Sequence, residues 1–275
     1  MANFGAISAD KLSKLVGTPQ SPVLIDVRDD EDFAAHPHLI PSSIRRDFAA
    51  VEQWAGDYAA ASVVVICKRG KKLSEGVAAF LRLAGTNAEI LEGGSEAWEA
   101  AGLPMVPVEN TPGKSASGNT LWVTRSRPKI DRIACPWLIR RFVDPAARFL
   151  FVSAAEVPAV VEKFGATPFD IDGIHWSHRG ETCTFDTMIE EFRLDFPALR
   201  RLADIVRGAD TDRLDLAPQA AGLLAVSLGL SRMHSSDLAQ LDDGMLIYDA
   251  FYRWARDATE EKHNWEAHTP RVRKP

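Results

Sequence analysis

The chain has 275 residues, of which 46% are hydrophobic and 25% charged, and its formal net charge is −6. That length exceeds the usual size of one domain, so we expect two compact units with the composition of a globular protein. Neither half has an excess of Lys and Arg, so we expect no nucleic-acid partner. No run approaches the roughly 18 apolar residues of a membrane span, and the N-terminus lacks the features of a signal peptide. We therefore expect no membrane association and a cytoplasmic location.

The first part of the chain alternates short apolar strands with helical segments. Strand candidates lie at 23–27, 63–66 and 88–91, with helical segments at 51–58 and 73–84 between them. Near-continuous Val, Ile and Leu runs separated by helices are typical of a parallel sheet with helices on both faces. Residues 1–108 are therefore predicted to form an α/β domain. A Pro-, Gly- and Ser-rich segment without periodicity follows, and we place a linker at 109–119.

The second part has fewer strand candidates and more helix. Strands are predicted at 121–124 and 149–152, and apolar residues keep helical spacing over much of 186–262. We expect a mainly helical α+β domain at 120–265, followed by a flexible tail at 266–275.

A cysteine with basic neighbours lies where a strand gives way to a helix. Cys67 follows the apolar run 62–66, and the next five residues are Lys68, Arg69, Gly70, Lys71 and Lys72. A helix N-terminus and nearby cations stabilise a thiolate, and a glycine lets successive backbone N–H groups point inward toward an anion. The residues alone leave two readings open: a reactive thiol, or an inert cysteine buried at the end of a core strand.

This loop resembles the Cys-x-x-Gly-x-Arg active-site loop of the rhodanese family. The resemblance extends over about 8–105, through Leu24-Ile-Asp-Val-Arg28, His38-Leu-Ile-Pro41, Leu91-Glu-Gly-Gly94, Ala97-Trp98 and Gly102-Leu-Pro104. It implies that Cys67 takes a sulfane sulfur from a small-molecule donor, becomes a persulfide and passes the sulfur to a thiol acceptor. It also implies a supporting role for Asp26 and Arg28.

The loop departs from the family pattern at its last position. Lys72 stands where rhodaneses usually have Arg, so the charge is kept but the planar fork that grips an oxyanion at two points is lost. This departure puts the use of thiosulfate as donor in question. Phosphatases of related fold have a longer loop, so phosphatase activity is not expected.

The start of the second domain concentrates basic residues around a second cysteine. Its cations are Arg125, Arg127, Lys129, Arg132, Arg140 and Arg141, and Cys135 is the thiol among them. Two readings remain open: a solvated basic surface, or a shaped pocket for an oxyanion with Cys135 as an additional thiol.

A further group of potential ligands lies at 175–186. His175, His178 and Cys183, with Glu181 or Asp186, could bind one divalent metal ion, although their spacing matches no common zinc motif. The alternative is a hairpin with surface histidines and a buried cysteine. No cofactor is certain from the sequence.

The second domain resembles the C-terminal domain of ChrB-type chromate resistance proteins over about 120–258. The motifs are Lys129-Ile-Asp-Arg-Ile-Ala-Cys-Pro-Trp-Leu-Ile-Arg-Arg141, Pro168-Phe-Asp-Ile171, His178-Arg-Gly-Glu-Thr-Cys183, Ala221-Gly-Leu-Leu224 and Tyr248-Asp-Ala-Phe-Tyr252. The resemblance implies sensing of, or resistance to, chromate or a similar oxyanion, without the DNA regulation credited to a separate N-terminal region of ChrB.

Two hypotheses follow from the two resemblances together. In the first, the basic segment at 125–141 binds the oxyanion while Cys67 carries out sulfur transfer or thiol redox chemistry. In the second, the C-terminal domain is a non-catalytic oxyanion or metal sensor, and the rhodanese-like domain carries sulfur to a protein partner.

Overall fold

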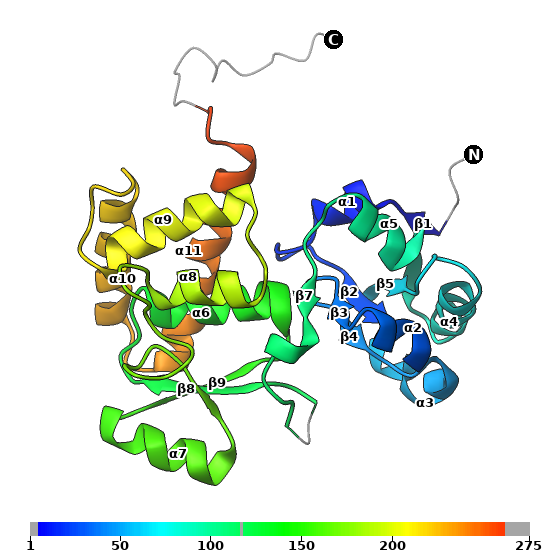
Figure 1. Ribbon diagram of the computed structural model, residues 1–275, viewed down its shortest axis with the longest axis horizontal. Helices are drawn as coiled ribbons and strands as arrows, with labels where there is room; N and C mark the ends of the chain where they lie inside the picture. Colours follow the sequence, from blue (N-terminus) through cyan, green and yellow to red (C-terminus); the bar gives the residue numbers. More distant parts are fainter. Residues whose placement is uncertain (1–4, 116–117, 262–275) are drawn as a thin grey trace, which may run out of the picture.

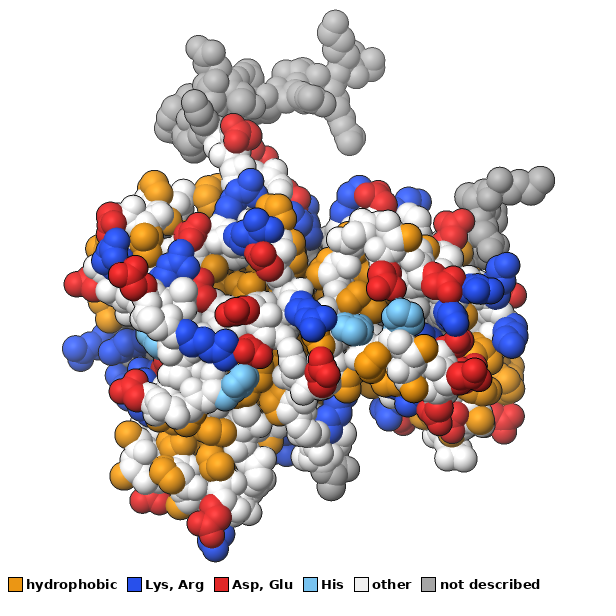
Figure 2. All heavy atoms as spheres, viewed as in Figure 1, with side chains coloured by type: hydrophobic (Ala, Val, Ile, Leu, Met, Phe, Trp, Pro, Cys, Tyr) orange, Lys and Arg blue, Asp and Glu red, His pale blue; other side chains and the backbone are white. Residues whose placement is uncertain are grey.

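The computed structural model describes residues 5–115 and 118–261; the tail predicted at 266–275 lies outside these ranges. Two lobes lie side by side, one built from β1 to β7 and the other from β8 to α11 (Figure 1). On the face shown in Figure 2, acidic and basic side chains are interspersed over both lobes. Within the described residues, no helix has the length and apolar character needed to cross a membrane.

The first lobe is built on a five-stranded sheet in which all paired strands are parallel. The strand order is β1 (Ala6–Ile7), β6 (Asn87–Leu91), β5 (Ser62–Ile66), β2 (Val23–Asp26) and β4 (Ile44–Arg45). The predicted parallel sheet is thereby confirmed. The sequence did not reveal β1 and β4, because two-residue strands carry no periodic signal.

Helices cover both faces of this sheet. Alternate strand residues point to opposite faces, so Leu24 and Val64 pack against α1 (Ala9–Ser13) and α5 (Gly94–Ala100). On the other face, Ile25 and Val65 pack against α3 (Val51–Trp54) and α4 (Lys72–Leu83). The short helix α2 (Asp30–Ala35) follows β2, and β3 (His38–Leu39) pairs with β7 (Val106–Pro107) in a small antiparallel ribbon.

The second lobe is mainly helical with a few strands, as predicted, and its small sheet is parallel. The central strand is β8 (Leu121–Arg125), between β10 (Thr167–Pro168) and β9 (Arg148–Val152). Helix α7 (Val157–Phe164) covers one face through Val157 and Val123. The helical body lies on the other face and comprises α6 (Asp131–Leu138), α8 (Thr184–Glu191), α9 (Pro197–Asp210), α10 (Ala220–Met233) and α11 (Asp237–Asp257).

Helix α6 was not predicted, because Pro136 lies inside it. Proline removes a backbone N–H and disfavours the helix interior. Here the chain nevertheless continues beyond α6 into a π-helical turn, Ile139–Val143. This wider turn places Phe142 at the boundary between the lobes.

The two lobes share one hydrophobic core. Leu12 and Trp98 of the first lobe belong to the same buried cluster as Phe142 and Tyr252 of the second. Gly17 allows the closest approach, since a Cβ atom there would lie 2.2 Å from the Phe142 ring. The α1 and α5 face of the first sheet is thereby completed by the second lobe.

The described residues of the segment between the lobes form local structure. It begins with a 3-10 turn, Val108–Asn110, and Lys114 forms an antiparallel bridge with Thr120. The Asn110 side chain also donates a hydrogen bond of 2.6 Å to the Glu191 carbonyl. This segment is thus attached to the second lobe.

Candidate functional sites

Cys67 lies at the carboxyl end of β5, immediately before the loop that leads into α4. Its side chain is 5% exposed. Its Sγ atom lies 3.2 Å from the Ser74 hydroxyl and 3.4 Å from the Lys71 backbone N–H. Ser74 faces the thiol from the first turns of α4. Ser74 was not singled out from the sequence, although a polar residue on the buried side of an amphipathic helix could have indicated it.

The surroundings of Cys67 lower the pKa of its thiol. Burial acts to raise this pKa, but hydrogen bonds from the Ser74 side chain and from the backbone of Lys71, Ser74 and Arg69 outweigh it. Hydrogen bonding to the charged form favours that form. The thiolate is therefore favoured by oriented donors of the loop and of the start of α4.

The basic residues of the loop line a cleft of about 410 Å³ that includes Cys67. Lys68 forms an ion pair with Asp32 at 2.6 Å, and Arg69 pairs with Glu96 at 3.1 Å. Lys71 and Lys72 are exposed and form no ion pair within residues 5–115 and 118–261. These two lysines remain available to an anionic ligand in the cleft.

Two glycines allow the Cys67 loop to lie directly against the start of α5. Gly94 has a φ of +63°, and a Cβ atom there would lie 2.2 Å from the Cys67 carbonyl oxygen. Gly70 has a φ of +62°, and its Cβ would lie 2.3 Å from the Leu91 carbonyl oxygen. The backbone N–H groups of Ser95 and Glu96 donate to the carbonyls of Cys67 and Lys68 at 2.9 and 3.0 Å. Backbone hydrogen bonds thus hold the Cys67 loop against the start of α5.

Asp26 and Arg28 form a buried ion pair with side chains 2% exposed. The Arg28 guanidinium binds both carboxylate oxygens of Asp26 and also donates to the His36 and His38 carbonyls. The pair therefore fastens the chain after α2 to the end of β2, the strand next to β5.

The six cations of the basic segment do not converge on one pocket. Arg125 and Arg132 both pair with Asp170, Arg140 pairs with Asp242, and Arg141 pairs with Asp249. Arg127 and Lys129 line a different cleft beside α10. The single oxyanion pocket considered from the sequence is therefore not assembled, because α6 and the π-helical turn point these side chains to different partners.

Cys135 is fully buried on α6. Burial, with a further contribution from the nearby Asp131 carboxylate, raises the pKa of its thiol well above the usual value. A thiol in that state is a poor nucleophile. The structure thus places Cys135, suggested as an additional thiol of an oxyanion pocket, in the core of the second lobe.

The three potential metal ligands predicted from the sequence are also not brought together. His175 is half exposed and lies 3.5 Å from Glu191, away from His178. Cys183 is buried at the start of α8, where its N–H donates to Asp186; Asp186 in turn pairs with Arg207. Glu181 is exposed. Of this set, His178 alone lies among several carboxylates.

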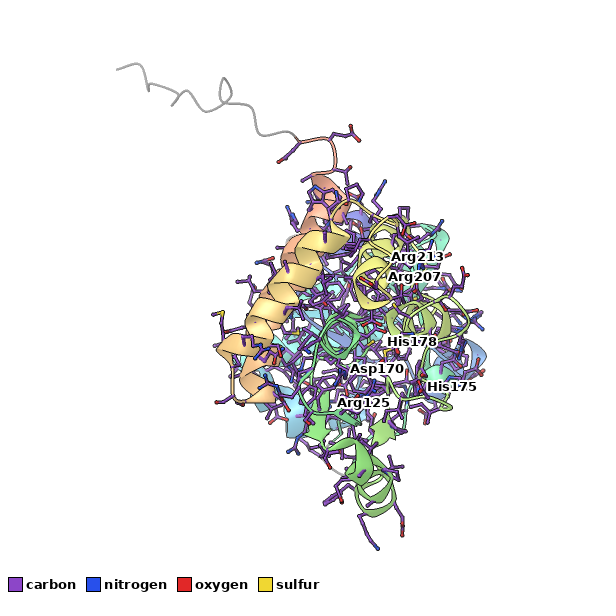
Figure 3. The ribbon with its side chains drawn as sticks, turned by 90° about the vertical axis from the view of Figure 1, so that its left-hand side faces the viewer. Arg125, Asp170, His175, His178, Arg207 and Arg213 are labelled. Carbon is purple, nitrogen blue, oxygen red and sulfur yellow. The ribbon has the colours of Figure 1, made fainter. Side chains whose placement is uncertain are left out.

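His178 faces three aspartates that come from separate parts of the second lobe. Its Nε2 lies 3.5 Å from Asp131, 3.5 Å from Asp170 and 3.2 Å from Asp210. We call these four residues the His178 cluster. Figure 3 shows Asp170, His178 and Arg125 near one another, with His175 to one side. The sequence alone does not single out Asp131, Asp170 or Asp210, since their proximity to His178 arises only in the fold.

The electrostatics of the His178 cluster are those of a crowded acidic site. Hydrogen bonds to Asp170 and Asp210 raise the pKa of His178 to about 10. Burial and the repulsion of Asp210 and Asp170 raise the pKa of Asp131 well above its usual value. Asp170 also suffers from burial, but His178, Arg132 and Arg125 lower its pKa.

The first lobe thus places a thiol loop at the carboxyl edge of a parallel sheet. A family model of the rhodanese-like domain matches residues 8–101. The second lobe matches a family model of the ChrB C-terminal domain over residues 122–255. The chain therefore carries a rhodanese-like domain followed by a ChrB C-terminal domain.

The three relatives that follow each cover less than half of this chain. Protein ChrB of Cupriavidus metallidurans is 35% identical over 133 residues, which are 48% of this chain and 39% of that protein. A thiosulfate sulfurtransferase from Pseudomonas aeruginosa is 25% identical, covers 37% of this chain and 19% of its own, and has a TM-score of 0.32. A rhodanese-related protein from Thermoplasma volcanium is 24% identical and covers 37% of this chain and 96% of its own, also with a TM-score of 0.32.

Proposed function

We propose that this protein is a sulfurtransferase that forms a persulfide on Cys67 and acts in resistance to chromate. The observation that carries the proposal is the set of hydrogen-bond donors that lower the pKa of the Cys67 thiol. A thiolate is the nucleophile required for attack on a sulfane sulfur. The cleft beside it, lined by Lys71 and Lys72, offers positive charge to an anionic donor.

The transfer requires two balanced steps. In the first, the Cys67 thiolate attacks the outer sulfur of a donor such as a small-molecule persulfide; the donor's S–S bond breaks, and the donor leaves as a thiolate. In the second, an acceptor thiolate attacks the outer sulfur of the Cys67 persulfide and regenerates the Cys67 thiolate. The terminal persulfide sulfur is anionic, so the inward N–H groups of the loop suit it as they suit the thiolate.

The choice of donor follows from the last residue of the loop. Lys72 contributes a point charge rather than the planar fork of arginine, and this favours donors with one localised charge over a thiosulfate held at two oxygens. We therefore propose a thiol persulfide as the preferred donor and thiosulfate as a poorer one.

The link to chromate rests on the ChrB C-terminal domain. Because the six cations at 125–141 lie in separate places, we propose that chromate reaches the protein at the Cys67 cleft. Chromate is a tetrahedral dianion, and it would compete there with a sulfur donor for Lys71, Lys72 and the backbone N–H groups.

The test is persulfide formation on the whole chain, followed by mass spectrometry. We expect a mass increase of one sulfur atom in the wild type, in Cys135→Ser and in Cys183→Ser, but not in Cys67→Ser. Sulfur transfer to a thiol should slow in the presence of chromate. A persulfide on Cys67→Ser, or none on the wild type, would overturn the sulfurtransferase proposal, and transfer rates indifferent to chromate would overturn the link between the two.

A further inference from the structure

The His178 cluster has more hydrogen-bond acceptors than donors. One imidazole nitrogen, Nε2, faces carboxylate oxygens of Asp131, Asp170 and Asp210 at 3.2 to 3.5 Å. A single N–H can donate a full hydrogen bond to only one of these oxygens. Three carboxylates therefore share one imidazole N–H, and a cation bound by several of their oxygens at once would take the place of that shared hydrogen.

Asp131 gives an independent indication of a missing ligand. Its side chain is 1% exposed, and its Oδ1 has no hydrogen-bond partner, whereas its Oδ2 accepts from the Thr184 N–H at 2.6 Å. Oδ2 also faces Nε2 of His178 at 3.5 Å, so Oδ1 alone is left without a partner. Buried carboxylate oxygens without a partner are costly, and they are normally paired or bound to a metal.

The separations of the donor atoms suit one metal ion. With metal–ligand distances of about 2.1 Å, neighbouring donors lie about 3.0 Å apart in an octahedron and about 3.4 Å apart in a tetrahedron. Nε2 lies 3.2 to 3.5 Å from its three carboxylates, and donor atoms of Asp131, Asp170 and His178 all lie within 4.8 Å of one another. Small side-chain movements would bring these atoms into coordination.

The neighbouring arginines leave this centre open. Arg125 and Arg132 both contact Oδ2 of Asp170, whereas Oδ1 of Asp170 faces His178. Metal binding at Nε2 would displace the proton of His178, and three carboxylates with two guanidiniums would then leave one net negative charge, which attracts a divalent cation. The arginines then orient Asp170, as outer-shell partners of metal ligands commonly do.

The position of the cluster in the fold is also that of a ligand site. Asp170 follows β10 by two residues, and Arg125 ends β8, the adjacent parallel strand. Asp131 begins α6, directly after the segment that leaves β8. Ligands of α/β sheets bind outside the carboxyl ends of the strands, and this is the edge at which the cluster lies.

We propose that Asp131, Asp170, His178 and Asp210 bind one divalent cation of the Mn²⁺ or Fe²⁺ type. Carboxylate oxygens with a single imidazole favour these ions, whereas structural zinc prefers sites rich in thiolates. The site belongs to the second lobe and does not depend on the chemistry of Cys67.

The test uses Mn²⁺ alone as the probe, added to the chelator-treated whole chain and followed by titration calorimetry and by the EPR signal of free Mn²⁺. We expect one Mn²⁺ per chain. Affinity should fall about tenfold or more in His178→Gln. His175→Gln is the matched control, because it changes a histidine of the same segment that lies outside the cluster, and it should bind as the wild type does.

A second variant keeps the test informative if one substitution disturbs folding. Asp210→Asn alters a less buried member of the cluster, and thermal unfolding in chelator shows whether each variant is folded. Added Mn²⁺ should raise the unfolding temperature of the wild type and of His175→Gln, and much less that of Asp210→Asn. Absence of Mn²⁺ binding by the wild type, or equal affinity in folded His178→Gln, would overturn the proposal while leaving the Cys67 persulfide untouched.

Discussion

The ionisation state of the Cys67 thiol depends on a few hydrogen-bond donors. Ser74 can donate its hydroxyl hydrogen either to the Lys71 carbonyl, at 3.0 Å, or to the Cys67 sulfur, at 3.2 Å. When the thiol is protonated, its own hydrogen can be donated to Ser74; when it ionises, the serine hydrogen must turn toward sulfur. Ser74 is therefore a positioning residue for the thiolate form.

Replacement of Ser74 by Ala should shift the pH dependence of Cys67 alkylation to higher pH. The pKa of the wild-type Cys67 thiol is lowered. Alkylation of Cys67 therefore stays fast at pH values below the pKa of an ordinary thiol, and it slows as the pH drops through the lowered pKa. Loss of a hydrogen bond to a charged group should slow alkylation about tenfold at pH 7. Iodoacetamide kinetics measure this. Ser62→Ala, which changes an exposed serine at the start of β5, should match the wild type. Equal profiles for the two variants would show that Ser74 has no such role.

At the scale of secondary-structure elements, the start of α5 holds the Cys67 loop in place. Alanine at position 94 would introduce a Cβ atom 2.2 Å from the Cys67 carbonyl oxygen at a φ of +63°, and the two backbone segments would have to separate. We expect Gly94→Ala to reduce the free energy of unfolding by more than the roughly 1–2 kcal/mol of a left-handed alanine, and to abolish the fast alkylation of Cys67.

Gly102→Ala is a control that separates the penalty of alanine at a positive φ from the clash between the two backbone segments. Gly102 also has a positive φ, +68°, but no atom lies within 4 Å of the added Cβ. Urea unfolding should show only the left-handed penalty for Gly102→Ala, with normal Cys67 reactivity. If Gly94→Ala proved no more destabilising than this control, the close packing of the two backbones would not be what fixes the loop.

The sequence predicts elements well where a local pattern exists. The strands around 23–27 and 63–66 and the helix after Cys67 follow from hydrophobic periodicity, and the thiol at a strand end follows from them. The His178 cluster could not be predicted in this way, because Asp131 and Asp210 lie 79 positions apart and meet only through the packing of α9 near α6. The single oxyanion pocket considered at 125–141 is not formed for a related reason: a run of charged residues in a sequence does not reveal their ion-pair partners.

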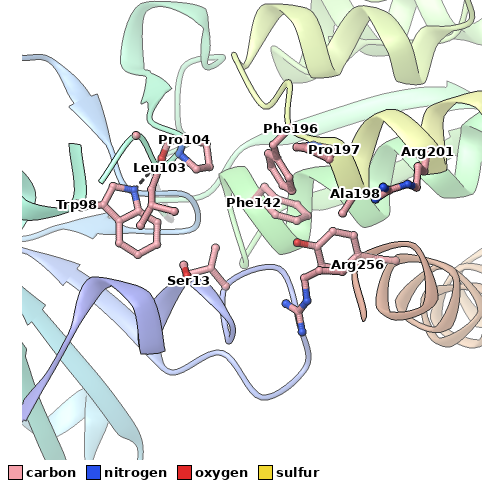
Figure 4. Close-up of a pocket in the computed structure, with 13 residues that line it drawn as sticks. Ser13, Trp98, Leu103, Pro104, Phe142, Phe196, Pro197, Ala198, Arg201 and Arg256 are labelled. Carbon is pink, nitrogen blue, oxygen red and sulfur yellow. Dashed lines mark hydrogen bonds between the residues drawn. The ribbon is translucent and has the colours of Figure 1, made fainter. Parts of the chain in front are cut away.

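Over the whole molecule, Phe142 connects the two lobes. Its ring packs against Gly17 and Tyr252, and its carbonyl accepts a hydrogen bond of 2.7 Å from Ser42 of the first lobe. Beside it lies a pocket of about 290 Å³ between the lobes, with Trp98 on one wall and Phe142 and Phe196 on the other (Figure 4). Arg256 of α11 also donates to the Lys14 carbonyl, at 2.9 Å.

Truncation of Phe142 should uncouple the lobes. Phe→Ala in a buried site costs about 3–5 kcal/mol, and the loss here falls on the shared core. Calorimetry should show one unfolding transition for the wild type and two for Phe142→Ala. Phe164→Ala removes the same side chain at a position 67% exposed and should leave the single transition unchanged. A single transition of normal enthalpy in Phe142→Ala would mean that the contact does not couple the lobes.

The shared core also affects how this protein can be divided. A fragment cut within 109–119 would expose Leu12, Trp98 and the apolar surface around them, which the second half covers in the intact chain. Exposed apolar patches of that kind promote self-association. The rhodanese-like lobe on its own would therefore be prone to aggregation, so a gene rearrangement that separated the two halves would expose part of the core that they share.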